Sequence, residues 1–118
     1  MRVLVIGSSG FLGTHLASHL QSLGHGVEGW GRRLGDPGSA EDYHRVDLLN
    51  DSALESREGP WDAAVLLAGH SVPGGFTQEL ALENQRMWTN ALDHLARVSP
   101  GLRVLVASSA HVYAPGPG

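Results

Sequence analysis

The sequence predicts an α/β fold in which helices cover a doubly wound parallel sheet of five strands. Three observations support this prediction. Short apolar runs alternate along the chain with segments of helical periodicity, an order that is typical of βα units. The runs at 3–6 and 63–68 are apolar throughout, which indicates strands buried on both faces. Right-handed crossovers then give the strand order 3-2-1-4-5.

The composition indicates a single globular domain that spans 1–118. A chain of 118 residues with 42% hydrophobic and 17% charged residues can bury one core. Its net charge of −4 gives no reason to expect nucleic acid or an anionic membrane as a partner. The absence of cysteine excludes disulfides and thiolate zinc sites. No apolar run is long enough for a signal peptide or a membrane span, so we expect a cytoplasmic protein.

A glycine-rich turn follows the first predicted strand directly, with glycines at the spacing G-x-x-G-x-x-G. Gly7 permits a tight exit from the strand, Gly10 lets the backbone approach a phosphate, and Gly13 lets the next helix pack close to the sheet. The amino end of that helix would then face the pyrophosphate of a dinucleotide. An ordinary βα turn is the alternative, but the position between a buried strand and a helix favours the dinucleotide. The candidate residues of this turn are Gly7, Ser9, Gly10, Phe11, Leu12 and Gly13.

The first helix is expected from 11 to 23, because Gly24 stands where a glycine ends a helix. His15 and His19 lie four residues apart on it, a spacing at which two imidazoles can share a metal. The sequence places no third ligand, so we expect two partly solvated histidines and no metal. The predicted apolar face consists of Phe11, Leu12, Leu16, Leu20 and Leu23.

The end of the second predicted strand, 27–30, bears on the choice of dinucleotide. In NAD-binding units of this type an acidic residue at this place hydrogen-bonds to the adenosine ribose. Here the place holds Gly31, and Arg32 and Arg33 follow it. Two guanidinium groups can hold a 2′-phosphate by charge-assisted, bidentate hydrogen bonds. We therefore expect NADP(H) rather than NAD(H), with a solvated basic loop as the alternative.

The remaining elements are expected between glycine and proline breaks. A third strand is predicted over 44–48, with Asp47 at its exit, and a short polar helix over 51–58. The fourth strand, 63–68, delivers its carboxyl end to the cofactor crevice, where small residues suit a wall against adenine and ribose. A long helix is predicted over 78–98 and a fifth strand over 103–109.

Together these segments resemble the amino-terminal part of an extended short-chain dehydrogenase/reductase. This superfamily includes the NAD-dependent epimerase/dehydratase family, which modifies nucleotide sugars. The resemblance implies a Rossmann-type sheet and hydride chemistry on a nucleotide sugar. Within the superfamily, the members that act on GDP- or dTDP-linked deoxysugars are the most similar at 67–71 and 100–106. The matching segments follow the order and the intervals of the family: 7–13, Val46-Asp47-Leu48, 65–69, Asn84 with 89–92, and 106–113.

The resemblance also implies roles for individual residues in binding the cofactor. Asp47 would accept a hydrogen bond from the adenine amino group, and Leu48 would pack on the ring. The residues expected to line the adenosine and the ribose next to the diphosphate stand at the end of the fourth strand: Leu67, Ala68 and Gly69.

Ser109 matches the catalytic Ser/Thr of the family, whose hydroxyl binds the substrate hydroxyl or carbonyl. Ser108 and Tyr113 would shape the neighbouring pocket, and the alternative for both serines is to hydrogen-bond backbone at a strand end. The Tyr-x-x-x-Lys pair of the family, in which the tyrosine is the general acid or base, has no match, because the sequence holds no lysine. Whether the chain is itself an enzyme therefore stays open.

Three functions are compatible with these features. We favour the cofactor-binding portion of an NADP(H)-dependent nucleotide-sugar oxidoreductase, epimerase or dehydratase, truncated after its fifth strand. The alternatives are a non-catalytic dinucleotide-binding or regulatory module, and a catalytic site that another chain completes. An exposed fifth strand predicts that the isolated chain is marginally stable or associates, and a homodimer is left open.

Overall fold

A computed structural model describes residues 1–8, 11–31, 40–67 and 78–107 of the chain. They contain a five-stranded, all-parallel sheet in the order β3-β2-β1-β4-β5, so the predicted order is confirmed. The strands are β1 (Arg2–Ile6), β2 (Gly26–Gly31), β3 (Asp42–Arg45), β4 (Ala63–Leu66) and β5 (Arg103–Val106).

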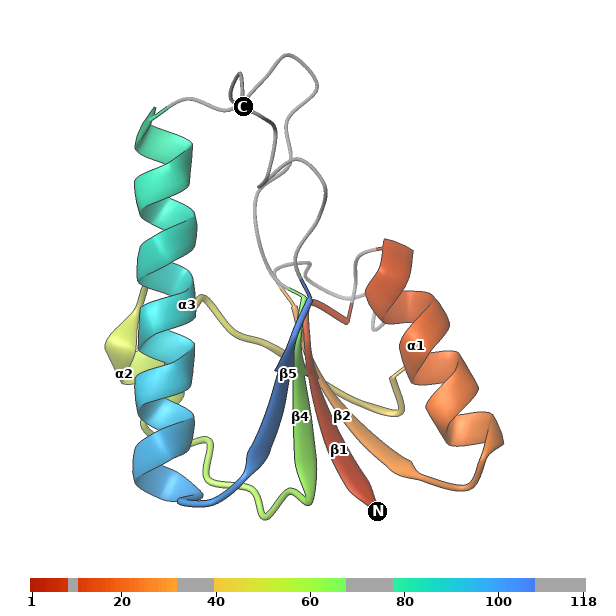
Figure 1. Cartoon of the computed structure of the whole chain (residues 1–118). Helices are drawn as coiled ribbons and strands as arrows, with labels where there is room; N and C mark the ends of the chain where they lie inside the picture. The colour runs from red at the N-terminus through yellow and green to blue at the C-terminus, as the bar shows by residue number, and fades with distance from the viewer. Residues whose placement is uncertain (9–10, 32–39, 68–77, 108–118) are drawn as a thin grey trace, which may run out of the picture.

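Helices cover both faces of this sheet (Figure 1). Helix α1 (Phe11–Ser22) lies on one face, whereas α2 (Asp51–Leu54) and α3 (Gln78–Val98) lie on the other. The long helix occupies the predicted range, 78–98. In the part of the chain that the structure describes, no helix has the length and apolarity needed to cross a membrane.

Strand β3 differs most from its predicted position. It occupies Asp42–Arg45, and not 44–48, in register with β2 from Glu28 to Gly31. The strand begins early because the Asp42 carboxylate pairs with Arg2 of β1. It ends early because Asp47 starts a turn, in which its Oδ1 accepts the Leu49 N–H at 3.0 Å. Helix α2 is likewise shorter than predicted and ends at Leu54.

The larger of two apolar cores lies between the sheet and α3. Helix α3 contributes Met87, Ala91 and Leu95, which lie on the face that its periodicity predicts. Trp30 and Trp61 meet edge to face, with ring centroids 5.7 Å apart and an interplanar angle of 80°. The other buried side chains of this core come from the strands, the turns and α2: Leu4, Ile6, Trp30, Val46, Leu48, Leu54, Trp61, Ala64 and Leu66.

The smaller core lies under α1 and corrects the predicted face of this helix. Leu12 and Leu23 are 64% and 61% exposed, so neither packs on the sheet. The fully buried side chain of the helix in this core is Ala17, with Leu16 and Leu20 packed beside it. Small residues face the sheet because the helix approaches the backbone too closely for larger ones.

Strand β5 is an outer strand of the described sheet, as the sequence predicts. Helix α1 lies on the sheet face opposite α3, mainly against β1 and β2, and does not reach β5 (Figure 1). As a result Leu105 is 65% exposed and Val106 is 38% exposed. This strand presents apolar surface at the end of the sheet.

Candidate functional site

The carboxyl ends of β1 and β4 lie next to each other at the point where the strand order reverses. From β1 the chain continues to β2 on one side, and it returns through β4 on the other side. Ligands of open α/β sheets bind in the crevice outside such a reversal point. The two strand ends are joined there by a hydrogen bond from the Leu67 N–H to the Ile6 carbonyl at 2.8 Å.

The chain leaves β1 through Gly7, as the sequence predicts. Gly7 has φ +98°, a left-handed conformation that residues with a Cβ rarely adopt. The N–H groups of Gly7 and Ser8 both donate to the carbonyl of Trp30 on β2, at 2.7 and 3.2 Å. These two hydrogen bonds hold the start of the glycine-rich turn on the neighbouring strand.

Gly13 brings α1 into contact with this turn. A Cβ on Gly13 would lie 2.0 Å from the carbonyl oxygen of Gly7 and 2.7 Å from Cα of Ser8. No side chain fits at these distances, so the predicted reason for a glycine here is confirmed. The Thr14 hydroxyl adds a hydrogen bond to the Ser8 carbonyl at 3.2 Å. The first turn of α1 is thus held against the end of β1.

Two further residues of this region were missed by sequence reasoning. The side chain of Ser8 is fully buried and occupies the space that a Cβ on Gly29 of β2 would need, with its Oγ only 2.3 Å away. Ser8 Oγ has no hydrogen-bond partner among the described residues. The available signal was Gly29 itself, because a glycine inside a strand often marks a close approach of another segment.

Asp47 and Leu48 follow β3 and differ in exposure. The Asp47 side chain is exposed, and its Oδ1 holds the turn through Leu49. Leu48 is 4% exposed in the larger core, and its carbonyl accepts a hydrogen bond from Nδ2 of Asn90 at 2.7 Å. The side chain of Leu48 can therefore meet a ligand only through its small exposed edge.

The remaining predicted site residues are described in part or not at all. Leu67 is half-buried beside the smaller core at the end of β4. Phe11 opens α1, and Leu12 is exposed on its first turn. Nine predicted residues lie outside the described residues: Ser9, Gly10, Arg32, Arg33, Ala68, Gly69, Ser108, Ser109 and Tyr113.

A polar cluster lies near the amino ends of β1, β2 and β3. The Arg2 guanidinium donates to Glu28 Oε1 and to Asp42 Oδ2, both at 2.8 Å. His44 Nε2 lies 2.9 Å from Asp42 Oδ1. The hydrogen bond from Arg2 holds the pKa of Asp42 below its ordinary value of 3.8. Hydrogen bonds to Asp42 and Glu28 in turn raise the pKa of Arg2.

Glu28, Asp42 and His44 also bring their ligand atoms within 4.8 Å of one another, a donor set that suits a divalent cation. However, the guanidinium of Arg2 already contacts both carboxylates. A metal ion would have to displace this charge. We therefore assign the cluster as an ion-pair network that joins the three strands.

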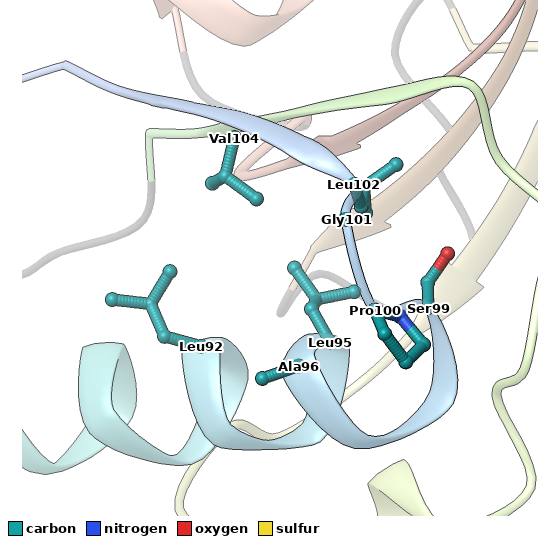
Figure 2. A pocket seen from close by; sticks show the side chains of 8 residues that line it. All are labelled: Leu92, Leu95, Ala96, Ser99, Pro100, Gly101, Leu102 and Val104. Atoms are coloured by element: carbon teal, nitrogen blue, oxygen red, sulfur yellow. The ribbon is translucent and has the colours of Figure 1, made fainter.

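A surface hollow lies elsewhere, between the carboxyl-terminal end of α3 and the start of β5. Its volume is about 350 Å³. Apolar side chains line it, among them Leu92, Leu95 and Val104 (Figure 2). This hollow is near the amino end of β5. It is therefore separate from the carboxyl ends of the strands and does not belong to the candidate site.

A parallel sheet in this order, with a glycine-rich turn and a helix amino end at its reversal point, defines a Rossmann-type domain. The chain belongs to the NAD dependent epimerase/dehydratase family, whose family model matches residues 3–118. A curated relative, GDP-mannose 3,5-epimerase 1 of Oryza sativa subsp. japonica, is 29% identical over 121 residues. That alignment covers 96% of this chain and 32% of the relative. The predicted resemblance to this family is confirmed.

Solved structures of several sugar-modifying enzymes are similar to this chain. A UDP-galactose 4-epimerase superposes with a TM-score of 0.76 at 26% identity, over 96% of this chain and 39% of its own. A uronate dehydrogenase from Agrobacterium tumefaciens in complex with NAD has a TM-score of 0.75 at 28% identity, over 93% and 41%. A UDP-glucose 4-epimerase from Bifidobacterium longum, in complex with NAD⁺ and UDP, has a TM-score of 0.80 at 21% identity, over 97% and 38%. The last comparison concerns the fold alone.

These comparisons leave most of each relative unmatched. The chain spans about a third of the curated relative and about two fifths of the solved structures. The shared part contains the sheet, α1 and the glycine-rich turn.

Proposed function

We propose that the chain binds a nicotinamide dinucleotide outside the carboxyl ends of β1 and β4, with the diphosphate at the amino end of α1. The close approach at Gly13 carries this proposal, because it leaves no room for a side chain between α1 and the turn after Gly7. The first N–H groups of a helix have no partner inside it, and the helix dipole favours negative charge there. Together they make this end a suitable phosphate site.

The adenosine would lie on the β3 side of this crevice. In this proposal the exposed Asp47 carboxylate accepts a hydrogen bond from the adenine amino group, and Leu48 contributes an edge beneath the ring. Leu67, Ala68 and Gly69 at the end of β4 line the adenosine and its ribose. The exposed position of Asp47 and the position of Leu67 beside Ile6 support this placement.

We propose that NADP(H) binds more tightly than NAD(H). Strand β2 ends at Gly31, so the last residue of this strand offers no carboxylate that would repel a 2′-phosphate, and Arg32 and Arg33 follow in the sequence. The solved uronate dehydrogenase and UDP-glucose 4-epimerase are complexes with NAD, so this preference would set the chain apart from them.

The reaction that such a domain would serve is hydride transfer between the nicotinamide and a sugar carbon of a nucleotide sugar. Ser109 would orient the sugar oxygen. The sequence holds no lysine, so these 118 residues do not supply the Tyr-x-x-x-Lys pair that moves the proton. This observation favours a second candidate function for the chain by itself, a dinucleotide-binding module without turnover.

Calorimetric titration of the chain with NADPH and NADH tests the proposal. We expect both to bind, NADPH more tightly. Gly13→Ala should weaken binding at least tenfold, because its Cβ must push α1 away from Gly7. Gly26→Ala is the matched control, since a Cβ at Gly26 meets nothing within 4 Å. Failure of the folded wild-type chain to bind either dinucleotide would refute the function, and equal affinity for both would refute the NADP preference.

A further inference from the structure

Glu28 is a buried carboxylate inside β2, and three donors match it. Its exposed fraction is only 7%. Oε2 accepts the indole N–H of Trp30 at 2.8 Å, and Oε1 accepts the indole N–H of Trp61 at 3.1 Å. Arg2 donates to Oε1 at 2.8 Å. A carboxylate remains charged at such a place only when hydrogen bonds and a cation compensate for its lost hydration.

Trp30 connects this carboxylate to the glycine-rich turn. Its side chain is 1% exposed and is fixed by Glu28, by the edge-to-face contact with Trp61, and by His94 at a centroid distance of 6.3 Å. Its backbone carbonyl is the acceptor for the N–H groups of both Gly7 and Ser8. The residue that Glu28 holds in place is therefore the residue that holds the turn.

We propose that Glu28 is a positioning residue for the dinucleotide site and acts through Trp30. This inference rests on the proposed dinucleotide binding. When the Trp30 indole N–H loses its acceptor, the end of β2 can shift. The Gly7 and Ser8 N–H groups then shift too, because both donate hydrogen bonds to the Trp30 carbonyl. Backbone N–H groups recognise a phosphate only within a fraction of an ångström of the required position. The Glu28 side chain lies on the face of β2 that packs in the larger core, so it would not contact the ligand.

A substitution at Asp42 distinguishes a positioning role of Glu28 from a contribution to stability alone. It pairs with the same Arg2 as Glu28 does, at the same distance of 2.8 Å. Asp42→Asn therefore weakens the ion-pair network but leaves both indole hydrogen bonds of Glu28 in place. If Glu28 only stabilises the fold, both substitutions should act on ligand binding in proportion to their effect on stability.

The experiment compares Glu28→Gln, Trp30→Phe and Asp42→Asn in the full chain. Three quantities are measured: the Kd for NADPH, the thermal midpoint, and amide hydrogen exchange at Gly7 and Ser8 without ligand. Glu28→Gln should raise Kd about tenfold and speed exchange at both amides. Trp30→Phe, which removes the indole N–H and keeps an aromatic ring, should give a similar change. Asp42→Asn should leave Kd within about twofold even where it lowers the thermal midpoint.

The double variant Glu28→Gln/Trp30→Phe tests whether the two residues act as one unit. Its Kd should equal that of the weaker-binding single variant, because either change already breaks the connection. Additive losses, unchanged exchange at Gly7 and Ser8, or an equal effect of Asp42→Asn would overturn the proposal. If Glu28→Gln does not fold, the same criteria apply to Trp30→Phe. If the wild-type chain binds no dinucleotide, the proposed function fails, while amide exchange still decides whether Glu28 positions the turn.

Discussion

The side chain of Ser8 packs so closely against Gly29 of β2 that no additional atom fits at Gly29. A Cβ on Gly29 would lie 2.3 Å from Ser8 Oγ and 2.7 Å from the Cβ of Ala40. Gly29 does not have a positive φ. The constraint at this position is therefore the packing of Ser8 and Ala40, and not the backbone conformation.

Gly29→Ala should accordingly destabilise the fold by about 1–3 kcal/mol, the usual range for overpacking. Urea denaturation provides the measurement, and Gly26→Ala provides the control, because Gly26 lies three residues earlier in β2 and a Cβ there meets nothing within 4 Å. Adding Ser8→Gly to Gly29→Ala should recover part of the loss, because it removes the opposing Oγ. A Gly29→Ala protein as stable as the control would contradict the close packing of Ser8 and Ala40 against Gly29.

Individual residues also show where sequence reasoning succeeds. The roles of Gly7 and Gly13 are local, since each depends on neighbours within a few positions, and both could be predicted from spacing. The surroundings of Glu28 could not. Its partners Arg2 and Trp61 lie 26 and 33 positions away, and only the folded sheet brings them together. The one available signal was an acidic residue inside an apolar strand.

At the scale of elements, the existence and order of strands and helices were predictable and several boundaries were not. The long helix has a strong amphipathic pattern, and its predicted range is correct. Strand β3 is short and polar, so hydrophobic periodicity does not locate it. Its position is set by the pairing of Asp42 with Arg2, a contact between distant segments. The face of α1 was misjudged at Leu12 and Leu23 because the helix packs through small residues.

The ion pair between Arg2 and Asp42 makes the stability of the folded chain depend on pH. Hydrogen bonding from Arg2 lowers the pKa of Asp42 in the folded chain from its ordinary value of 3.8. A carboxyl group whose pKa is lowered by folding stabilises the folded chain. This stabilisation is complete at a pH above the pKa of the group in the unfolded chain, and it is lost as the pH falls through the pKa in the folded chain. The Arg2 guanidinium stays charged over this range, because an arginine loses its proton only far above neutral pH.

We therefore expect the free energy of unfolding to fall as the pH is lowered from about 5 to below 3.8, and Asp42→Asn to reduce this dependence. The Asp42 side chain is 44% exposed, so the contribution should stay below about 1 kcal/mol. Urea denaturation at several pH values measures it, with the exposed Glu58→Gln as control. An Asp42→Asn protein with the full wild-type pH dependence would contradict this assignment.

At the scale of the whole molecule, the sheet ends in an open, apolar strand. Leu105 and Val106 of β5 are exposed. Val104 of the same strand lines the apolar hollow beside α3 (Figure 2). Unpaired outer strands favour edge-to-edge association when no charge or proline protects them. The described part of β5 carries one charge, on Arg103.

We expect the 118-residue chain to self-associate through this edge. Sedimentation at increasing concentration should show dimers or larger species, and Leu105→Lys should shift the distribution toward monomer. Leu82→Lys is the control, because Leu82 is similarly exposed, at 58%, but lies on α3. A compact, stable monomer at high concentration would contradict this expectation.

In the proposed complex the dinucleotide lies over the amino end of α1, and an NMR titration of the chain with NADPH tests this placement most directly. We expect saturable amide shifts concentrated at Gly7, Ser8, Gly13 and Leu67. Shifts concentrated instead around Val104, in the hollow between α3 and β5, or the absence of any saturable shift, would contradict it.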